Sequence, residues 1–271
     1  MGLNVKQGIK LGVIGCGKMA SSILGGLAKN RFMPNENIFV FDTDMEASGK
    51  LCQKYDFTES FSISDLVSNV DIILIATKPF VIGEVLSEIK EHYDEQLILS
   101  ILAGVKIKKY TSALKNAKVI RIMPNTPALV NAGMSAICAG NNVADYEIDF
   151  AFDLMANCGK VIKTTEDKMD IITALSGSGP AFYYKIIDCL AQSAQKLGLS
   201  KDEASLLSAQ TAFGSAKMLI ENNFEAQKLI NNVTTPGGCT EVGNIVLNNS
   251  NLQEIFDETI EKTMQKAIEL G

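Results

Sequence analysis

Short apolar runs alternate with amphipathic helical patterns over about the first 165 residues, and this alternation most constrains the fold. We expect strands at 10–14, 37–42, 71–77, 96–102, 118–123, 134–140 and 160–165. Helical patterns follow the first three runs: one from a glycine turn to about Asn30, one at 45–55 and one at 81–93. Such alternation is typical of a mostly parallel sheet covered by helices on both faces.

The pattern changes after about Asp167. No strand pattern follows, and helical stretches continue to the C-terminus, with a Gly/Pro break expected at 176–180. The predicted fold class is therefore α/β: a Rossmann-type, mostly parallel sheet domain at 1–166, followed by an all-α domain at 167–271. The helices present Leu206, Leu207, Phe213 and Leu219 on apolar faces. Either a second copy of the chain or a self-contained bundle could cover them.

Composition excludes several classes of protein. The net charge is −6, and the only arginines are Arg31 and Arg121, so the basic face of a nucleic-acid binder is not expected. The longest apolar runs, 72–76 and 97–105, are far shorter than the roughly 20 residues of a membrane helix. The N-terminus lacks the apolar core of a signal peptide. We expect no membrane or nucleic-acid partner.

The six cysteines lie at 16, 52, 138, 158, 189 and 239, without close pairs. This spacing argues against a disulfide scaffold or a metal site and favours a reducing, cytoplasmic location. The single histidine, His92, lies in a charged stretch that predicts a solvated helix end rather than a catalytic position.

The segment "GVIGCGKMA" predicts a dinucleotide site, because it follows the first strand and precedes a helix. Gly15 would permit the tight turn, Gly17 would let the pyrophosphate approach, and Ala20 would let the helix pack on the strand, with Lys18 and Met19 between them. Asp42 ends the second strand, where a carboxylate binds the adenosine ribose. Because a carboxylate repels a 2′-phosphate, we expect NADH rather than NADPH. Two alternatives stay open: Asp42 caps the next helix, or Lys18 or Lys50 admits NADPH.

The chain lacks an obvious histidine to protonate a carbonyl substrate. Lys78, at the end of a strand, is one candidate donor. A C=N substrate offers another solution, because it is protonated on nitrogen before hydride arrives. The segment "TTPGGCT" would suit it, with Pro236 in the first turn of a helix and the N–H groups of residues 237–240 cradling a carboxylate. Alone, this segment is more typical of an ordinary loop.

Three further motifs occur in order behind "GVIGCGKMA" and "LSILAGVKI": "RIMPNTPALVNAG" at 121–133, "ALSGSGPAFYY" at 174–184 and "NNVTTPGGCTEVG" at 231–243. Together they resemble the pyrroline-5-carboxylate reductase family, from about residue 9 to the last helix. The resemblance implies reduction of 1-pyrroline-5-carboxylate to L-proline with NAD(P)H, the last step of proline biosynthesis. It also implies homodimers formed through interlocked helical domains, which often assemble into decamers.

The resemblance also implies residue roles. The substrate carboxylate would lie against Pro236, Gly237, Gly238, Cys239 and Thr240, with Thr240 as the catalytic residue near the ring nitrogen. Ser176, Gly177 and Ser178 would lie beside the substrate ring, and Ala76, Thr77, Lys78, Pro79, Asn125 and Thr126 near the cofactor. Cys239 stands where many members have Thr or Ala, and Glu241 where an apolar residue is common. An inward-facing Glu241 would weaken binding of an anionic substrate, whereas a solvent-facing one would have no effect.

Two other functions are compatible with parts of the sequence. A 3-hydroxyacid dehydrogenase of similar architecture would use a lysine on a helix of the second domain, such as Lys185. A nucleotide-binding regulator would bind NADH without turnover, but it would not need a carboxylate cradle.

Overall fold

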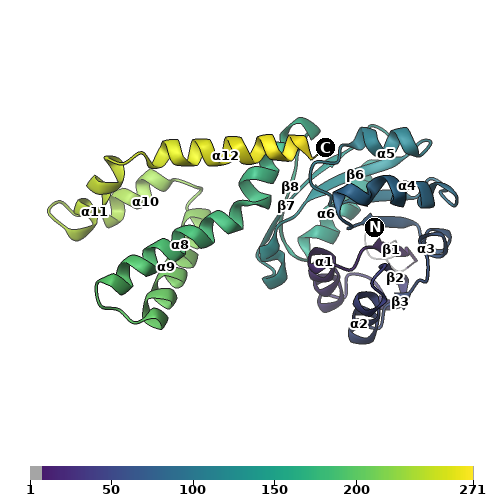
Figure 1. The fold of residues 1–271 in the computed structure, drawn as a ribbon, viewed down its shortest axis with the longest axis horizontal. Coiled ribbons are helices and arrows are strands. Elements are labelled where there is room, and N and C mark those ends of the chain that lie inside the picture. The colour runs from purple at the N-terminus through teal and green to yellow at the C-terminus, as the bar shows by residue number, and fades with distance from the viewer. Residues whose placement is uncertain (1–7, 271) are drawn as a thin grey trace. The chain divides into compact units, whose positions relative to one another are not determined.

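The computed structural model describes residues 8–270, and a single sheet organises the first part of the chain (Figure 1). Its strand order is β3-β2-β1-β4-β5-β6-β7-β8. The strands are β1 Leu11–Ile14, β2 Ile38–Phe41, β3 Thr58–Glu59, β4 Ile72–Ile75, β5 Leu97–Ser100, β6 Lys118–Met123, β7 Gly133–Ala139 and β8 Gly159–Lys163. The pairs from β3 to β6 are parallel, β7 is antiparallel to β6, and β8 is parallel to β7. The mostly parallel sheet predicted from the sequence is confirmed.

The seven predicted strands are all present, and β3 is the strand that the sequence did not reveal. It contains two residues, too few to form an apolar run. The helices beside the sheet are α1 Lys18–Lys29, α2 Met45–Tyr55, α3 Ile63–Asn69, α4 Ile82–Lys90, α5 Ile107–Ala113 and α6 Asp145–Ala156. Of these, α1, α2 and α4 follow the predicted helical patterns. Short 3-10 turns occur at Asn35–Asn37, Pro79–Val81, Thr126–Val130 and Glu166–Lys168.

Each face of the sheet has its own apolar layer. Successive side chains of a strand point to opposite faces, so Leu74 of β4 joins one layer while Ile73 and Ile75 join the other. The first layer includes α1 and α6, with Leu24 and Leu154 fully buried. Burial on both faces explains why these strands are continuous apolar runs rather than alternating ones.

The remaining helices are α7 Met169–Ile172, α8 Gly179–Lys196, α9 Lys201–Glu221, α10 Ala226–Val233, α11 Cys239–Asn248 and α12 Leu252–Glu269. The α-helix is interrupted close to the predicted Gly/Pro break at 176–180, but the interruption is a π-helical turn, Thr173–Gly177, that joins α7 to α8. The Ser178 N–H donates to the Thr173 carbonyl at 2.9 Å, five residues back. Pro180 is the second residue of α8, where a missing N–H breaks no helical hydrogen bond.

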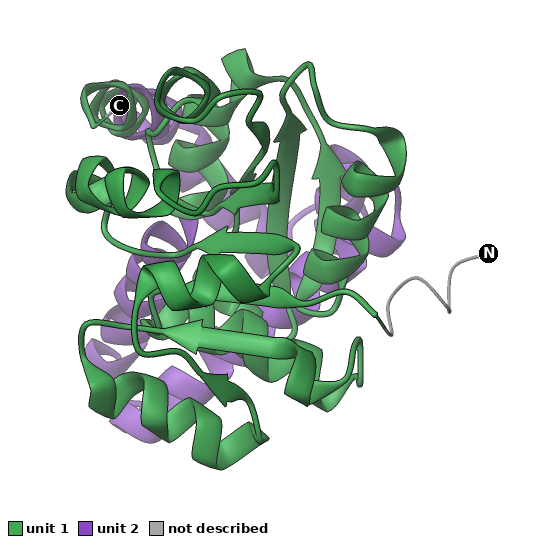
Figure 2. Cartoon of the chain, turned by 90° about the vertical axis from the view of Figure 1, so that its right-hand side faces the viewer, with its two compact units in different colours: residues 1–178, 262–271 green, residues 179–261 purple. Residues whose placement is uncertain are grey.

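The chain forms two compact units (Figure 2). One contains the sheet, continues to Ser178 and includes the end of α12 from Lys262; the other is Gly179–Glu261. This division lies beyond the boundary expected at 166/167, and two contacts explain the difference. Met169 of α7 packs against Ala136 and Cys138 of β7, and the Asn125 side-chain amide donates to the Ser176 carbonyl at 3.2 Å. The first helical residues after β8 therefore belong to the sheet unit.

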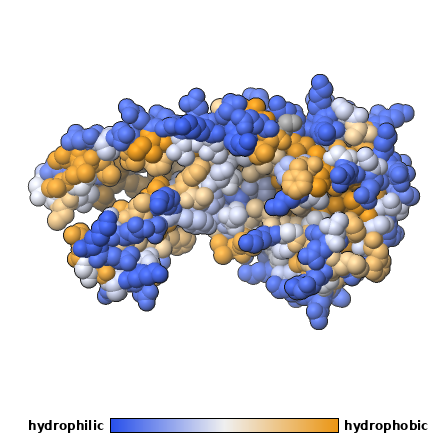
Figure 3. Space-filling model, viewed as in Figure 1, coloured by the Kyte–Doolittle hydropathy of each residue, from blue (hydrophilic) through white to orange (hydrophobic). Residues whose placement is uncertain are grey.

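The helical unit has almost no core of its own. Within residues 179–261, only Gly179, Ala191 and Ala204 are buried. Large apolar side chains are exposed instead, among them Leu206, Leu207 and Phe213, and hydrophobic residues gather on the surface of these helices in Figure 3. A self-contained bundle would bury these side chains, so this alternative is wrong. Between residues 8 and 270, no helix is long and apolar enough to cross a membrane.

We predict that charges on the exposed apolar faces will separate the oligomer. Full-length protein should behave in light scattering as a dimer or a multiple of it, because exposed apolar surface of this extent marks an interface. Leu206→Lys combined with Phe213→Lys should shift the population toward monomer. The matched control, Met45→Lys, changes an equally exposed apolar residue of α2 in the sheet unit and should have no effect. A monomeric wild-type chain would contradict the prediction.

Candidate active site

The turn after β1 requires glycine at its first position. Gly15 has φ +101°, and a Cβ there would lie 2.8 Å from the carbonyl carbon and oxygen of Ala76, just after β4. The Gly15 N–H donates to the Phe41 carbonyl of β2 at 2.8 Å. The turn is therefore held between the carboxyl ends of β2 and β4, at the point where the strand order reverses. Ligands of such sheets bind at this place.

Gly17 is open where Gly15 is crowded. A Cβ on Gly17 would meet no atom of the chain within 4 Å, so packing of the chain does not demand a glycine here. Gly17 is the N-cap of α1 and provides no side-chain cap. The N–H groups of Lys18, Met19 and Ala20 have no partner inside the helix, because no turn precedes them. These donors and the helix dipole suit an anion such as a pyrophosphate, while the Ala20 side chain is buried in the core beneath.

Asp42 joins the glycine turn to the end of β2. Its Oδ2 accepts from the Cys16 N–H at 2.6 Å, and its Oδ1 accepts from the Asp44 N–H at 2.9 Å. The helix-capping alternative for Asp42 is wrong, because Asp44 is the N-cap of α2 and accepts from the Glu46 N–H. Burial, with a smaller effect of Asp42, raises the pKa of the Cys16 thiol to about 12, so Cys16 stays protonated.

A cavity of about 880 Å³ opens at this edge of the sheet. Predicted cofactor residues line it: Gly15, Gly17, Lys18, Met19, Asp42, Ala76, Thr77, Lys78 and Thr126. Pro79 and Asn125 do not line it; Pro79 begins the 3-10 turn before α4. Lys50 is also outside this cavity and pairs with Glu46 at 2.6 Å on the exposed surface of α2.

Two acidic residues of the cavity were missed in the sequence. Glu84 and Glu88 of α4 line it together with Asp42. Their spacing of four residues puts them on one face of the helix, and that helix follows a strand that ends at the cavity. This spacing was the available signal. Two lysines, Lys18 and Lys78, line the cavity together with these three carboxylates.

Asn125 does not line the cavity but binds the predicted substrate segment, Ser176–Ser178. Its side-chain amide donates to the Ser176 carbonyl at 3.2 Å, and its Oδ1 accepts from the Met134 N–H at 2.8 Å. Gly177 packs closely against Met123, since a Cβ on Gly177 would lie 2.3 Å from the Met123 methyl carbon and would force that flexible side chain to move. Met123 also lines the cavity, so Ser176 and Gly177, the last residues of the π-helical turn, and Ser178, its C-cap, lie beside the cavity.

The helix after the loop, α11, starts later than predicted. The helix starts at Cys239 with Gly238 as its N-cap, so Pro236 lies before the helix and not in its first turn. Thr235–Gly238 forms a β-turn in which the Gly238 N–H donates to the Thr235 carbonyl at 2.8 Å. Proline followed by a glycine with positive φ is the sequence of a type II turn, and Gly237 has φ +73°.

The N–H groups of this loop are not all available. The Gly238 N–H is used by the turn, and the Gly237 N–H donates to Glu241 Oε2 at 2.8 Å. The prediction that both glycine N–H groups are free is therefore wrong. The N–H groups of Cys239 and Thr240 have neither a side-chain cap nor a partner inside the helix. Thr240 is the second residue of α11, so its hydroxyl is not the helix cap.

Comparisons with known proteins agree with these features. A family model described as pyrroline-5-carboxylate reductase dimerisation matches residues 166–270, and one described as NADP oxidoreductase coenzyme F420-dependent matches residues 10–104. The pyrroline-5-carboxylate reductase of Methanosarcina acetivorans is 34% identical over 97% of this chain and 98% of its own length. That of Aquifex aeolicus is 34% identical over 97% of each. The chain belongs to the pyrroline-5-carboxylate reductase family.

Solved structures of the family have the same fold. The pyrroline-5-carboxylate reductase of Coxiella burnetii superposes with a TM-score of 0.91 at 32% identity, covering 97% of this chain and 98% of that one. The Plasmodium falciparum pyrroline carboxylate reductase with NADP bound gives a TM-score of 0.88 at 32% identity, covering 98% and 99%.

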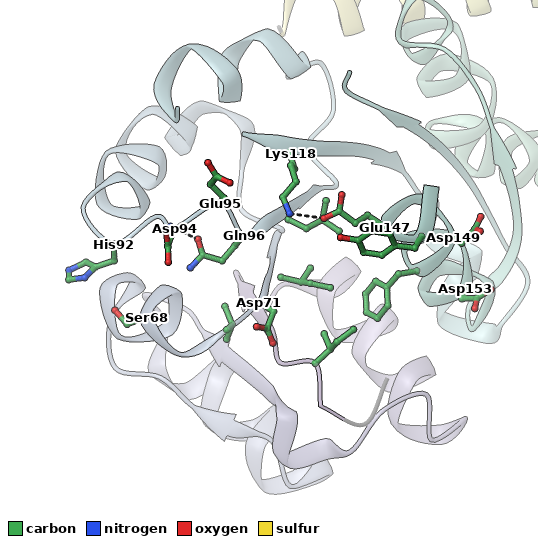
Figure 4. A pocket seen from close by; sticks show the side chains of 16 residues that line it. Ser68, Asp71, His92, Asp94, Glu95, Gln96, Lys118, Glu147, Asp149 and Asp153 are labelled. Atoms are coloured by element: carbon green, nitrogen blue, oxygen red, sulfur yellow. Dashed lines mark hydrogen bonds and ion pairs between the residues drawn. The ribbon is translucent and has the colours of Figure 1, made fainter. Parts of the chain in front are cut away.

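A larger cavity, about 1180 Å³, lies at the opposite edge of the sheet (Figure 4). It is lined by the first residues of β4, β5 and β6, Ile72, Leu97 and Lys118, and by acidic residues such as Asp71 and Asp94. Lys118 pairs with Glu147 at 2.7 Å. Exposed His92 also lines it, in the turn after α4. This edge holds the amino ends of the parallel strands and lacks the glycine turn, so the smaller cavity has the features predicted for the cofactor site.

The two glycines of the turn should respond differently to alanine. Gly15→Ala should lower stability by about 1–3 kcal/mol, because alanine is strained at positive φ and its Cβ would contact Ala76. Gly17→Ala should melt near the wild-type temperature, since its Cβ meets no chain atom, yet raise the Kd for NADH at least about tenfold. Calorimetry and fluorescence titration would measure both. Unchanged NADH binding by Gly17→Ala would contradict this assignment.

Proposed function

We propose that this protein reduces 1-pyrroline-5-carboxylate to L-proline with a hydride from NAD(P)H. The observation that carries the proposal is the start of α11, where two free N–H groups lie beside the hydroxyl of Thr240. These groups match a substrate that carries a carboxylate next to a ring nitrogen. The family membership of the chain supports the same reaction.

The cofactor site fits a dinucleotide. The open space at Gly17 and the first-turn N–H groups of α1 would hold the pyrophosphate, and Asp42 would accept from the ribose hydroxyls. Thr77, Lys78 and Pro79, after β4, and Asn125 and Thr126, after β6, would lie on the nicotinamide side. NAD(P)H, when bound there, supplies the hydride.

The chain's own groups would bind and orient the substrate. The N–H groups of Cys239 and Thr240, with the helix dipole of α11, would hold the carboxylate. The Thr240 hydroxyl would hydrogen-bond the ring nitrogen, and Ser176–Ser178 would lie beside the ring. The C=N bond is protonated on nitrogen before hydride adds to its carbon, so the reaction needs no histidine acid. Protonation before hydride transfer therefore explains how the proposed site can work without a histidine.

The charges around the cavity favour NADH over NADPH. Asp42, Glu84 and Glu88 would all repel a 2′-phosphate, and Lys50 is already paired with Glu46. We also propose that α8–α12 form the dimer interface, since the family model for this region describes dimerisation and its apolar faces are exposed. Assembly of dimers into decamers and a cytoplasmic location follow from the family resemblance and the scattered cysteines.

Steady-state kinetics with both coenzymes tests the reaction and the coenzyme preference together. Wild type should turn over 1-pyrroline-5-carboxylate, with higher kcat/KM for NADH than for NADPH, and should not oxidise 3-hydroxyacids. Asp42→Ser should raise the NADPH-to-NADH ratio of kcat/KM about tenfold, which corresponds to about 1.36 kcal/mol. A wild type that prefers NADPH would refute the role of Asp42 alone. Oxidation of 3-hydroxyacids without pyrroline-5-carboxylate turnover would refute the reaction.

Thr240 provides a sharper test of the loop. Thr240→Ala removes the hydroxyl but keeps the backbone N–H groups. A hydrogen bond to a charged group contributes roughly 1.5–3 kcal/mol, so kcat/KM should fall about ten- to a hundredfold. The Kd for NADH should stay unchanged. Thr240→Ser keeps the hydroxyl and should retain most of the activity. An alanine variant with wild-type kcat and KM would show that the hydroxyl has no role in the reaction.

A further inference from the structure

The proposed carboxylate cradle already contains a carboxylate of the chain. Glu241 is the third residue of α11, and its Oε2 accepts from the Gly237 N–H at 2.8 Å. Glu241 is half-buried and points back across the start of the helix. Of the two orientations open from the sequence, the structure shows the inward one.

The rest of the chain explains why Glu241 takes this position. In an ordinary capping box, a glutamate at the third helical position accepts from the N-cap N–H. The start of α9 has this arrangement, with the Ser200 N–H donating to Glu203 Oε2 at 2.9 Å. At α11 the N-cap N–H, that of Gly238, is used by the β-turn. Glu241 therefore reaches one residue further back, to Gly237.

This arrangement places a negative charge where the substrate's charge would bind. Anions are stabilised at a helix N-terminus, and Glu241 already occupies that field beside the free N–H groups of Cys239 and Thr240. No cation nearby in the sequence offsets it, because residues 229–261 contain neither lysine nor arginine. The preceding lysine, Lys228, pairs with Glu225 at 3.0 Å.

We propose that Glu241 sets the affinity of this site for carboxylates by competing with the substrate carboxylate for the start of α11. The inference rests on the proposed function of the loop. Binding of an anionic substrate displaces the Glu241 carboxylate from Gly237 or places two carboxylates side by side, and either raises KM. The chemical step depends on other groups, so kcat does not respond. Product release is faster for the same reason, because L-proline carries the same carboxylate.

Glu241→Gln tests this directly, since glutamine can still accept from the Gly237 N–H but carries no charge. We expect KM for 1-pyrroline-5-carboxylate to fall about five- to tenfold, with kcat within about twofold of wild type. Inhibition by L-proline should strengthen by a similar factor. Inhibition by L-prolinol, which has a hydroxymethyl group in place of the carboxylate, should not change. A structural role alone would not separate these two inhibitors.

Glu203→Gln is the matched control, because it neutralises a glutamate at the same position of α9, away from the loop. It should leave KM and both inhibition constants unchanged, and thermal melting of both variants would measure any loss of capping. If Glu241→Gln folds poorly, Glu241→Ile restores the apolar residue common in the family and should show the same fall in KM. With an active wild type, an unchanged or raised KM in the folded variant overturns the role of Glu241. A wild type without pyrroline-5-carboxylate turnover overturns the proposed function instead.

Discussion

The close approach of Gly15 to Ala76 is the constraint on which the cofactor site depends. With φ +101° and only 2.8 Å between its would-be Cβ and the Ala76 backbone, the chain leaves β1 in a direction available only to glycine. The same turn is held to β2 through Phe41 and Asp42. Three parallel strands therefore end around one backbone segment, and α1 starts there with its N–H groups uncapped. The cavity, its charge and its fit to a dinucleotide follow from this geometry.

The two compact units solve the problem of burial differently. The sheet unit encloses an apolar layer on each face, whereas the helical unit buries little more than Ala191 and Ala204. Small residues and long amphipathic helices make a surface suited to a partner chain, and the dimerisation model of the family covers this region. The loop proposed to bind substrate lies in the unit that has the weaker core. Its shape is therefore maintained by local hydrogen bonds. The Gly238 N–H donates to the Thr235 carbonyl, the Gly237 N–H donates to Glu241, and the Asn244 side-chain amide donates to the Thr234 hydroxyl.

Polar groups were harder to place from the sequence than apolar ones. The glycine turn was predictable because only glycine satisfies its backbone, and the strands were predictable because burial on both faces leaves an apolar run. Asp42 was located correctly at the end of β2, but its backbone partners, Cys16 and Asp44, come from two different segments. The N–H groups of Gly237 and Gly238 were expected to be free, and both have acceptors. Hydrogen-bond partners depend on turn geometry within a few tenths of an ångström, and residue order does not determine that.

The sequence by itself determined the fold class, the order of seven strands, the glycine turn and the family, because periodicity and glycine positions are local properties. Only the tertiary structure decided which residues share a cavity, as with Glu84 and Glu88 opposite Lys18. It also decided that the π-helical turn at Thr173–Gly177 belongs to the sheet unit, through the packing of Met169 and the hydrogen bond from Asn125 to the Ser176 carbonyl. Finally, it decided that Glu241 faces the start of its own helix. The first two outcomes depend on contacts between segments that are far apart in the sequence. The third depends on the turn at Thr235–Gly238, whose hydrogen bond uses the Gly238 N–H and leaves the Gly237 N–H for Glu241.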